Sequence, residues 1–395
     1  MPYYRALGET PRKRHTQFRR PDGGLYTEEL MGLEGFSSES ALLYHVGLPA
    51  AIVDAVAVDE EPSALTPNRP LLPLHLRSHG LQFANADAVT GRRLLMGNTD
   101  VRLSYVGAST PSPYYRNAIG DECVYVESGS ATLETVFGVL EVGAGDYVVI
   151  PTSTTHRWLP HSKGGEPLRL LVVEASGHIG PPRRYLSPRG QYLEHSPFCE
   201  RDIRAPSEPL VVEGADVEVL VRTRQGLTVY TYATHPFDVV GWDGCLYPWV
   251  VSIHDFEPIT GRLHQPPPVH QMFDGPNFVI CSFVPRLFDY HPLAIPAPYN
   301  HANVDSDEVL FYVGGDFMSR KGAGIELGSL SLHPAGFTHG PQPGSVEASI
   351  GSPSTDELAV MVDTFRPLEI GAAARAISDP GYAWSWSQRP PTRST

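Results

Sequence analysis

Short apolar runs alternate with turn residues along most of the chain. Runs such as CVYVESG (123–129) and NFVICSFVP (277–285) are rich in Val, Tyr and Phe. Proline and glycine, with 38 and 37 of the 395 residues, fall mainly between such runs. This pattern is typical of many short antiparallel strands. We therefore predict an all-β protein built from sandwiches or barrels, with few short helices.

The same pattern predicts some individual elements. RTRQGLTVY (222–230) indicates a hairpin that turns at Gly226. Helical periodicity is best in TEELMGL (27–33) and in DELAVMVDTFRPLEI (356–370), so the few helices are expected there, the second over only half its length.

A polar stretch rich in proline and arginine, residues 177–209, is the best candidate for a domain boundary. We place an N-terminal β domain at residues 1–205 and a C-terminal β domain at residues 206–395. The chain is long enough for two domains that each bury a core. The tail WSWSQRPPTRST (384–395) is expected to dock at its tryptophans and to be loose at its end.

Charge and cysteine content exclude several classes of partner. The net charge of −14 argues against nucleic acid or an anionic membrane, because both bind basic surfaces. No apolar run approaches the roughly 18–20 residues of a membrane-spanning helix, and the N-terminal residues lack the apolar core of a signal peptide. The four cysteines form no CxxC pair, so neither a disulfide framework nor a zinc ribbon is indicated. We expect a cytoplasmic protein.

One phrase occurs twice in the chain. YYRNAIGDECVYVESG (114–129) and YNHANVDSDEVLFYVGGDF (299–317) both place an acid pair before an apolar run and a glycine after it. When the phrases are aligned on their acid pairs, Asn117 falls on Asn303, Glu122 on Glu308, and Tyr115 on His301. The histidine of the second phrase is thus a tyrosine in the first.

Each phrase is followed by a second motif. The C-terminal copy has GSLSLHPAGFTHG (328–340) and the N-terminal copy has GDYVVIPTSTTHRW (145–158). This pairing resembles the two motifs of the cupin superfamily, whose members are small β-barrels of jelly-roll type. The resemblance implies a double cupin. The second C-terminal motif fits the family spacing in full, whereas the family's usual second histidine in the first motif is Asn303 here.

The C-terminal copy carries a candidate metal site. Ligands from neighbouring strands can converge inside a barrel mouth, because side chains alternate between the two faces of a strand. His301, Glu308 and His339 would then form a two-His-one-carboxylate triad, which leaves three positions open and suits non-haem Fe(II) oxygen chemistry. A closed structural zinc site would instead want four ligands.

The N-terminal copy is predicted to lack a full metal site. Glu122 and His156 supply two ligands, and Tyr115 does not readily replace a neutral imidazole. We expect an ordinary hydrogen-bonded pair there. The N-terminal barrel is then structural, and a candidate surface for oligomerisation.

Several longer stretches resemble the homogentisate 1,2-dioxygenase family: residues 237–301, HGPQPG (339–344) and GGLYTEELMGLEGF (23–36). The resemblance implies an enzyme that uses Fe(II) and O2 to open the ring of homogentisate to maleylacetoacetate, in tyrosine and phenylalanine catabolism. It also implies a homo-oligomer, either a trimer or a dimer of trimers.

The resemblance assigns roles to individual residues. The iron ligands carry over to His301, Glu308 and His339. The family's catalytic histidine matches His254 in SIHDFEPI (252–259), and a histidine that lines the substrate pocket matches His333. A histidine near its ordinary pKa suits removal of a ring hydroxyl proton. The alternative for His254 is a residue that only caps its loop.

Two departures from the family bear on the substrate. Ala302 stands where the family has arginine, and Phe317 stands where it has tyrosine. A substrate carboxylate still needs a cationic or donor partner. The candidates are Arg262, Arg286 and His270, and we count His270 among the substrate-binding residues. His264 and His270 bracket a polyproline segment, either a pocket wall or a rigid surface connection.

Three alternatives to homogentisate cleavage remain open. The first is a dioxygenase for gentisate or another related hydroquinone. The second is a non-catalytic cupin that stores or senses a small molecule. The third is a cupin isomerase that uses zinc or manganese, since the ligands alone do not fix the metal.

Overall fold

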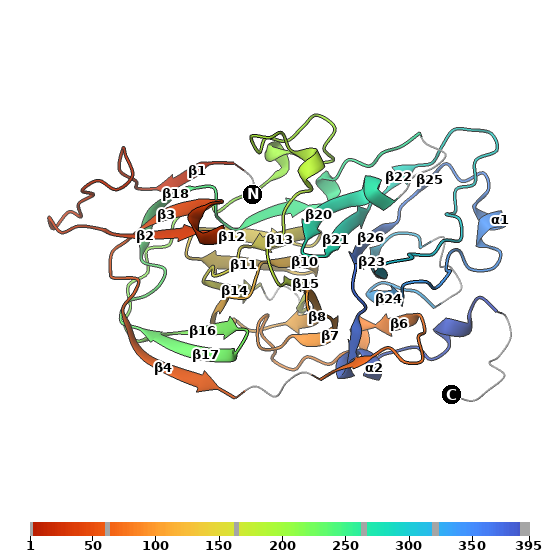
Figure 1. Cartoon of the computed structure of the whole chain (residues 1–395), viewed down its shortest axis with the longest axis horizontal. Coiled ribbons are helices and arrows are strands. Elements are labelled where there is room, and N and C mark those ends of the chain that lie inside the picture. The colour runs from red at the N-terminus through yellow and green to blue at the C-terminus, as the bar shows by residue number, and fades with distance from the viewer. Residues whose placement is uncertain (1–2, 60–63, 162–165, 262–266, 318–323, 388–395) are drawn as a thin grey trace. The chain divides into compact units, whose positions relative to one another are not determined.

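The computed structural model describes residues 3–59, 64–161, 166–261, 267–317 and 324–387. It confirms an all-β double cupin (Figure 1). Within the described residues, the α-helices are α1 (Ser345–Ser349) and α2 (Ala372–Ala376). Short 3-10 turns are η1 (Glu34–Phe36), η2 (Ser78–Gly80), η3 (Arg183–Tyr185), η4 (Glu200–Asp202), η5 (Ile253–Asp255), η6 (Pro267–His270) and η8 (Tyr382–Trp384). No described helix has the length and apolar character that crossing a membrane requires.

The chain divides into two compact units that exchange short segments. Unit 1 comprises residues 1–62, 83–92 and 104–252, and unit 2 comprises residues 63–82, 93–103 and 253–395. The chain passes from one unit to the other within β8 (Val101–Ala108). Residues 206–252, which we expected in the C-terminal domain, belong to unit 1. The predicted single boundary between residues 205 and 206 therefore differs from the division into units, which also assigns residues 63–82 and 93–103 to unit 2.

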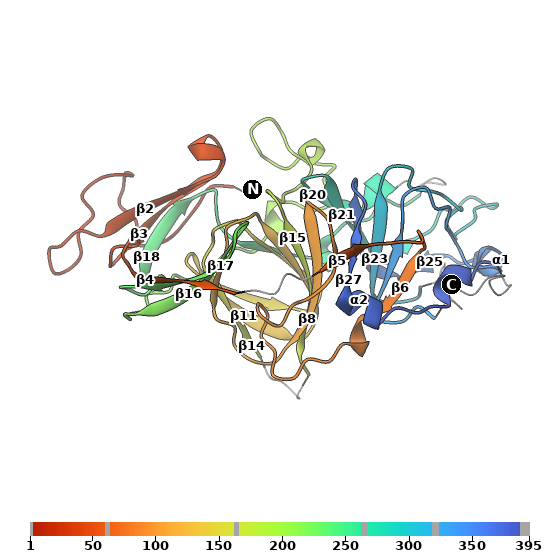
Figure 2. The same ribbon diagram turned by 60° about the horizontal axis from the view of Figure 1, so that its bottom comes forward.

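Unit 1 is built from three groups of paired strands. The first has the order β19 (Trp249–Ser252), β13 (Asp146–Ile150), β10 (Glu122–Ser128) and β15 (Leu168–Ala175). The second has the order β12 (Gly138–Gly143), β11 (Ser130–Thr135), β14 (His156–Pro160), β9 (Tyr114–Asn117), β16 (Val217–Thr223), β17 (Gly226–Tyr232) and β4 (Ile52–Val58) (Figure 2). The third has the order β1 (Arg5–Gly8), β18 (Val239–Gly244), β3 (Ser40–His45) and β2 (Thr27–Gly32).

The buried core of unit 1 accounts for the apolar runs in the sequences of its strands. Val124 and Val126 of β10 pack in one cluster with Trp158 of β14, and all three side chains are fully buried. The hairpin of β16 and β17 is confirmed, with Thr223 opposite Gly226 at the turn. Gly226 has φ 129°, a conformation that side chains disfavour.

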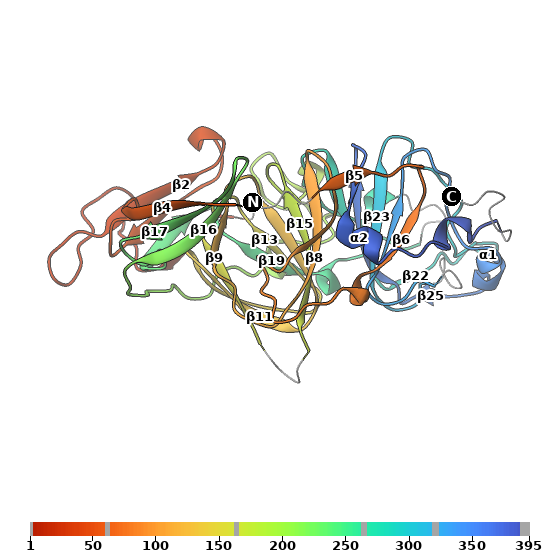
Figure 3. The same ribbon diagram turned by 90° about the horizontal axis from the view of Figure 1, so that it is seen from below.

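Unit 2 contains one large sheet with the order β20 (Gln271–Gly275), β21 (Phe278–Phe283), β26 (Leu358–Thr364), β23 (Asp307–Gly314), β24 (Ser329–His333) and β6 (Leu74–Arg77). A two-stranded ribbon pairs β22 (Arg286–Leu287) with β25 (Ser354–Thr355) (Figure 3). β27 (Glu369–Gly371) pairs with β5 (Leu65–Pro67) and β7 (Arg93–Gly97). In β23, Leu310 and Tyr312 share a face with Glu308 and pack in one apolar cluster with Met361.

Both expected helices are strands. Residues 27–32 form β2, which pairs with β3, and residues 358–364 form β26, which lies between β21 and β23. Four consecutive residues of β26 are buried, so the side chains on both faces of this strand are covered. A short apolar run of this kind cannot be told from a buried helix by its periodicity.

Candidate metal centre

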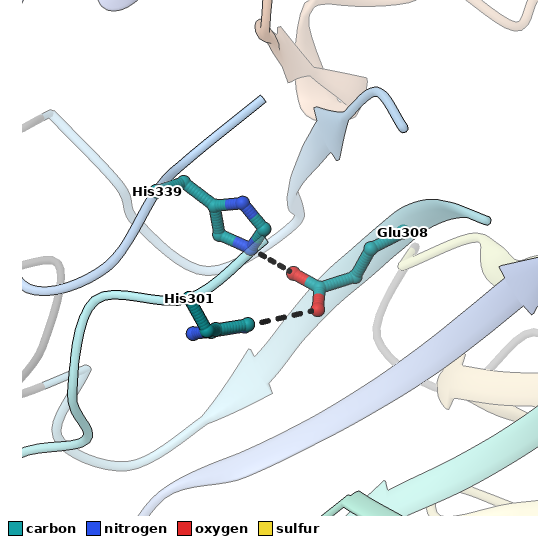
Figure 4. Close-up of side chains that lie close together, drawn as sticks. All are labelled: His301, Glu308 and His339. Carbon is teal, nitrogen blue, oxygen red and sulfur yellow. Dashed lines mark ion pairs between the residues drawn. The ribbon is translucent and has the colours of Figure 1, made fainter. Parts of the chain in front are cut away.

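Three side chains of unit 2 converge on one point. His301 Nε2 lies 3.7 Å from Glu308 Oε2, and His339 Nε2 lies 3.2 Å from Glu308 Oε1 (Figure 4). One ligand atom from each residue lies within 4.8 Å of the other two. Glu308 is the second residue of β23, so its position is fixed by the pairing of β23 with β24 and β26.

The backbone holds the two histidines together. His301 N donates to His339 O, and His339 N donates to His301 O, both at 2.8 Å. This isolated bridge places the two imidazole centres 4.4 Å apart. The first ligand and the last therefore reach the same point although 37 residues lie between them in the sequence.

Hydrogen bonds at Nδ1 define which nitrogen of each ring can bind a cation. His301 Nδ1 donates to Tyr299 O at 3.1 Å, and His339 Nδ1 donates to Phe337 O at 3.0 Å. A carbonyl oxygen only accepts, so each neutral ring carries its proton on Nδ1 and a lone pair on Nε2. His339 Nε2 is buried and makes no hydrogen bond to the described residues. Two lone pairs and a carboxylate thus face one another, an arrangement that fits a divalent metal ion.

Glu308 is held as a carboxylate by its surroundings. Burial would raise its pKa, but the hydrogen bond that His333 Nδ1 donates outweighs burial and holds the pKa well below its usual range. Asp363 lies directly opposite Glu308 in the pairing of β23 with β26. Burial and the Glu308 charge raise the pKa of Asp363 well above its usual range, which favours a neutral acid there.

His333 joins the three ligands as a fourth member of the cluster. It is fully buried, its Nδ1 lies 2.8 Å from Glu308 Oε1, and its Nε2 lies 2.9 Å from the hydroxyl of Tyr382. The ring stacks on that of His339, with centres 4.1 Å apart. Both ring nitrogens are therefore already engaged. Substrate contact by His333 stays a prediction.

The remaining predicted residues lie on other elements of unit 2. His254 is exposed on η5, and its catalytic role stays a prediction. His270 is buried, with its ring centre 4.4 Å from that of Phe283, and burial together with Arg286 lowers its pKa to about 3. A neutral His270 cannot serve as a cation. Arg286 pairs with Glu357 at 3.2 Å.

Two further candidates, Arg262 and His264, lie outside the described residues. Phe317, which replaces a polar family position, packs edge-on against Tyr312 with ring centres 5.1 Å apart. It therefore extends the apolar cluster that shares a face with Glu308.

The corresponding point in unit 1 contains an arginine side chain. Arg92 donates from Nη1 and Nη2 to the two oxygens of Glu122, at 3.0 and 2.8 Å. Its Nη1 also lies 3.3 Å from Glu174 Oε1. Burial raises the pKa of Glu122, but the Arg92 charge dominates and lowers it to about 2. His156 lies near this pair, edge-on to Tyr115 with ring centres 5.4 Å apart.

Unit 1 also has a small polar cavity of about 40 Å³. It is lined by Glu29, His45, Pro49, Arg116, Val136, Thr155, Tyr232, Thr234, His235, Pro236 and Asp238. Among its lining groups, His45 contacts Asp238 at 2.6 Å and Glu29 at 3.0 Å, and Arg116 donates to the hydroxyls of Thr155 and Tyr232. The lining contains none of the three converging ligands of unit 2.

Comparison with known proteins decides the family. A family model described as "Cupin domain" matches residues 106–174. A protein of Saccharolobus solfataricus named "Putative dioxygenase" is 40% identical over 395 residues, which cover 98% of this chain and 99% of that protein. The chain belongs to the cupin dioxygenases.

More distant cupin dioxygenases carry a substrate in their names. A homogentisate 1,2-dioxygenase of Rhodopseudomonas palustris is 25% identical over 336 residues, which cover 80% of this chain and 72% of that protein. One of Emericella nidulans is 24% identical over 357 residues, which cover 83% and 77%. The predicted resemblance is thus confirmed as membership of the cupin dioxygenases. The "Cupin domain" match falls on the copy that contains Glu122.

Sequence reasoning missed two residues of these sites, Arg92 and Tyr382. Arg92 lies outside both repeated phrases, so nothing in the repeat marks it as the partner of Glu122. Tyr382 lies just before the tail at residues 384–395, whose tryptophans were the one sign that this segment docks.

Proposed function

We propose that this cupin dioxygenase binds one Fe(II) per chain in unit 2 and opens the ring of homogentisate or a related hydroquinone with O2. The convergence of His301, Glu308 and His339 is the observation that supports this most strongly. Two imidazoles and one carboxylate leave open positions at an iron ion, as non-haem oxygenases require. A homo-oligomer, trimer or dimer of trimers, in the cytoplasm is part of the proposal.

Each residue around the site has its own role in the proposed reaction. Bound iron would supply a template and an electron path between ring and oxygen. His301 and His339 present Nε2 because their Nδ1 protons are held by carbonyls. Glu308 supplies the negative charge that offsets the metal. The apolar side chains that share its face would exclude water from the ring.

We assign proton removal from the ring hydroxyl to His254. An exposed histidine can take a proton from the substrate and release it to water. A base of this kind contributes about 10²–10⁴-fold to rate. His254→Asn should therefore retain iron and substrate binding and lose turnover by roughly that factor. Near-normal turnover of an iron-loaded variant would end the assignment.

A hydroquinone without a carboxylate is the second candidate substrate, and the state of the basic side chains favours it. Among the described candidates for a carboxylate partner, His270 is neutral and Arg286 is paired with Glu357. Homogentisate binding would have to displace that pair or use Arg262. A substrate that lacks the carboxylate needs neither.

Oxygen uptake tests the proposal. The protein is loaded anaerobically with Fe(II), freed of excess metal, and assayed with homogentisate, gentisate and unsubstituted hydroquinone. We expect one iron per chain, and oxygen consumption equal to the substrate lost with at least one compound. Full iron without uptake on any of the three would favour a non-catalytic cupin. Activity with zinc or manganese and none with iron would favour an isomerase.

A further inference from the structure

We propose that residues 379–387, here called the C-terminal clasp, hold two of the metal ligands in position, and that Tyr382 is the positioning residue of the clasp. This inference rests on the proposed function, because it concerns a metal bound by His301, Glu308 and His339. It gives a role to a segment outside both repeated motifs.

A chain of two hydrogen bonds connects the clasp to Glu308. A carboxylate that binds a metal ion can only accept a hydrogen bond, so His333 Nδ1 must carry the proton of its 2.8 Å contact with Glu308 Oε1. A neutral His333 ring then has a lone pair on Nε2, which accepts from the Tyr382 hydroxyl at 2.9 Å. The Tyr382 hydroxyl thereby selects the tautomer of His333 that donates to Glu308.

A second set of contacts connects the clasp to the loop of His339. Trp386 Nε1 donates to Gly340 O at 3.2 Å, and its ring packs edge-on against Phe337 with centres 6.1 Å apart. Gln342 Nε2 donates to Ser385 Oγ at 2.9 Å. Phe337 and Gly340 flank the ligand, and Phe337 O also accepts from His339 Nδ1. The clasp therefore contacts the loop on both sides of His339.

The clasp is itself anchored within unit 2. Asp379 N donates to His75 O at 2.8 Å, and the Asp379 carboxylate pairs with Arg77 at 2.9 Å. Gly381 N donates to Asp379 Oδ1, which starts the turn of η8. Tyr382 is 2% exposed, so its hydroxyl is fixed where it meets His333. The segment is a docked part of the site, as the tryptophans of the tail predicted, and residues 388–395 lie outside the described residues.

Loss of the Tyr382 hydroxyl should weaken metal binding through His333. Without that donor, His333 can adopt the other tautomer, which would point a lone pair at the Glu308 carboxylate and remove its hydrogen bond. Partners that orient a metal ligand typically change metal affinity about 10–100-fold. We therefore expect Tyr382→Phe to raise the dissociation constant of Fe(II) by at least about tenfold.

The experiment compares two buried tyrosines. Tyr312→Phe is the matched control, because its hydroxyl contacts Ser331 at 3.3 Å and is not part of the chain to Glu308. The Fe(II) dissociation constant is measured by competition with a chelator, and the unfolding temperature is measured on the metal-free proteins. Tyr382→Phe is also made in a His333→Asn background, which keeps an N–H group for Glu308 but loses the contact with Tyr382.

The inference is supported if Tyr382→Phe weakens iron binding about tenfold or more, Tyr312→Phe changes it less than twofold, and the effect of Tyr382→Phe disappears in the His333→Asn background. Unchanged affinity, or an effect that persists in that background, overturns it, whatever the unfolding temperatures. In those cases the parent still binds iron and consumes oxygen, so the proposed function stands. A parent that binds no metal overturns both proposals.

Discussion

The two barrels of this chain share one scaffold and differ in what neutralises its buried glutamate. Three backbone features recur in both units. Asp121 and Asp307 each accept two backbone N–H groups, His156 and His339 each donate from Nδ1 to the carbonyl two residues earlier, and the bond from Ser153 N to Asn117 O matches the bond from Gly336 N to Asn303 O. The repeated phrase is thus a repeated set of contacts.

The two units differ in the group that neutralises this glutamate. In unit 1, Arg92 spans Glu122 and the facing Glu174. In unit 2, the facing residue is Asp363, whose raised pKa favours the neutral acid, and Glu308 faces the imidazoles. A carboxylate buried at this point needs a positive partner. One copy supplies the partner from its own chain, and we propose that the other takes it from solution as metal.

The largest expected effect is loss of the metal from one copy alone. His301→Ala should reduce bound iron from one per chain to none and reduce oxygen uptake to background, because two ligands remain. His156→Ala, at the position of unit 1 that corresponds to His339, should leave both unchanged. Iron analysis of the purified variants decides the matter. Iron loss in His156→Ala, or two irons in the parent, would refute the one-site comparison.

The next largest effect is expected at Arg92, the cation that unit 1 supplies from its own chain. Arg92→Met should destabilise the protein by about 3–5 kcal/mol, because it leaves Glu122 as an uncompensated buried charge. Glu122→Gln in the same chain should recover a large part of the loss. Denaturant unfolding measures both. An arginine that acts only as packing would give a loss that Glu122→Gln does not reverse.

Removal of the metal should destabilise unit 2 and leave unit 1 unchanged. A ligand present at a hundred times its dissociation constant stabilises the folded state by about 2.7 kcal/mol. Chelation should therefore speed hydrogen exchange in β23 and β24 and leave β10 and β13 unchanged. Equal acceleration in both units would show that the metal stabilises the chain by another route.

The smallest effect is expected at the tyrosine that replaces a ligand. The Tyr115 hydroxyl is buried and makes no hydrogen bond to the described residues. Tyr115→Phe should therefore change the free energy of unfolding by less than about 1 kcal/mol and leave iron content unchanged. Denaturant unfolding and iron analysis check this. A larger loss would indicate that the hydroxyl has a partner such as bound water.

The repeated motifs made the convergence of the three candidate ligands predictable from sequence. A fixed spacing of ligands, glycines and proline specifies where strands begin and turn, so the motif spacing alone was enough to group His301, Glu308 and His339. The hairpin at Gly226 followed from the same local signals. Such features depend on residues near one another in sequence, and sequence patterns report on those.

The missed features depend on contacts between distant segments. Arg92 precedes Glu122 by 30 residues, and Tyr382 follows His333 by 49, with no motif at either position. β26 was misjudged for a related reason, because its pairing with β21 and β23 joins segments that are distant in sequence. The division into units could not be predicted from the sequence, because each unit consists of three separate stretches of the chain.

The pairing of β6 with β24 has a consequence for how the protein is made. Leu76 lies opposite Leu330, so an early segment completes the sheet that carries His333. At a synthesis rate of about 5–20 residues per second, β6 leaves the ribosome roughly 10–50 seconds before β24 exists. During that interval β6 has no partner strand, and unpaired apolar segments invite misassembly. The barrel of unit 2 should therefore be the last part of the nascent chain to mature, and residues 253–395 alone lack the strand β6 that completes its sheet.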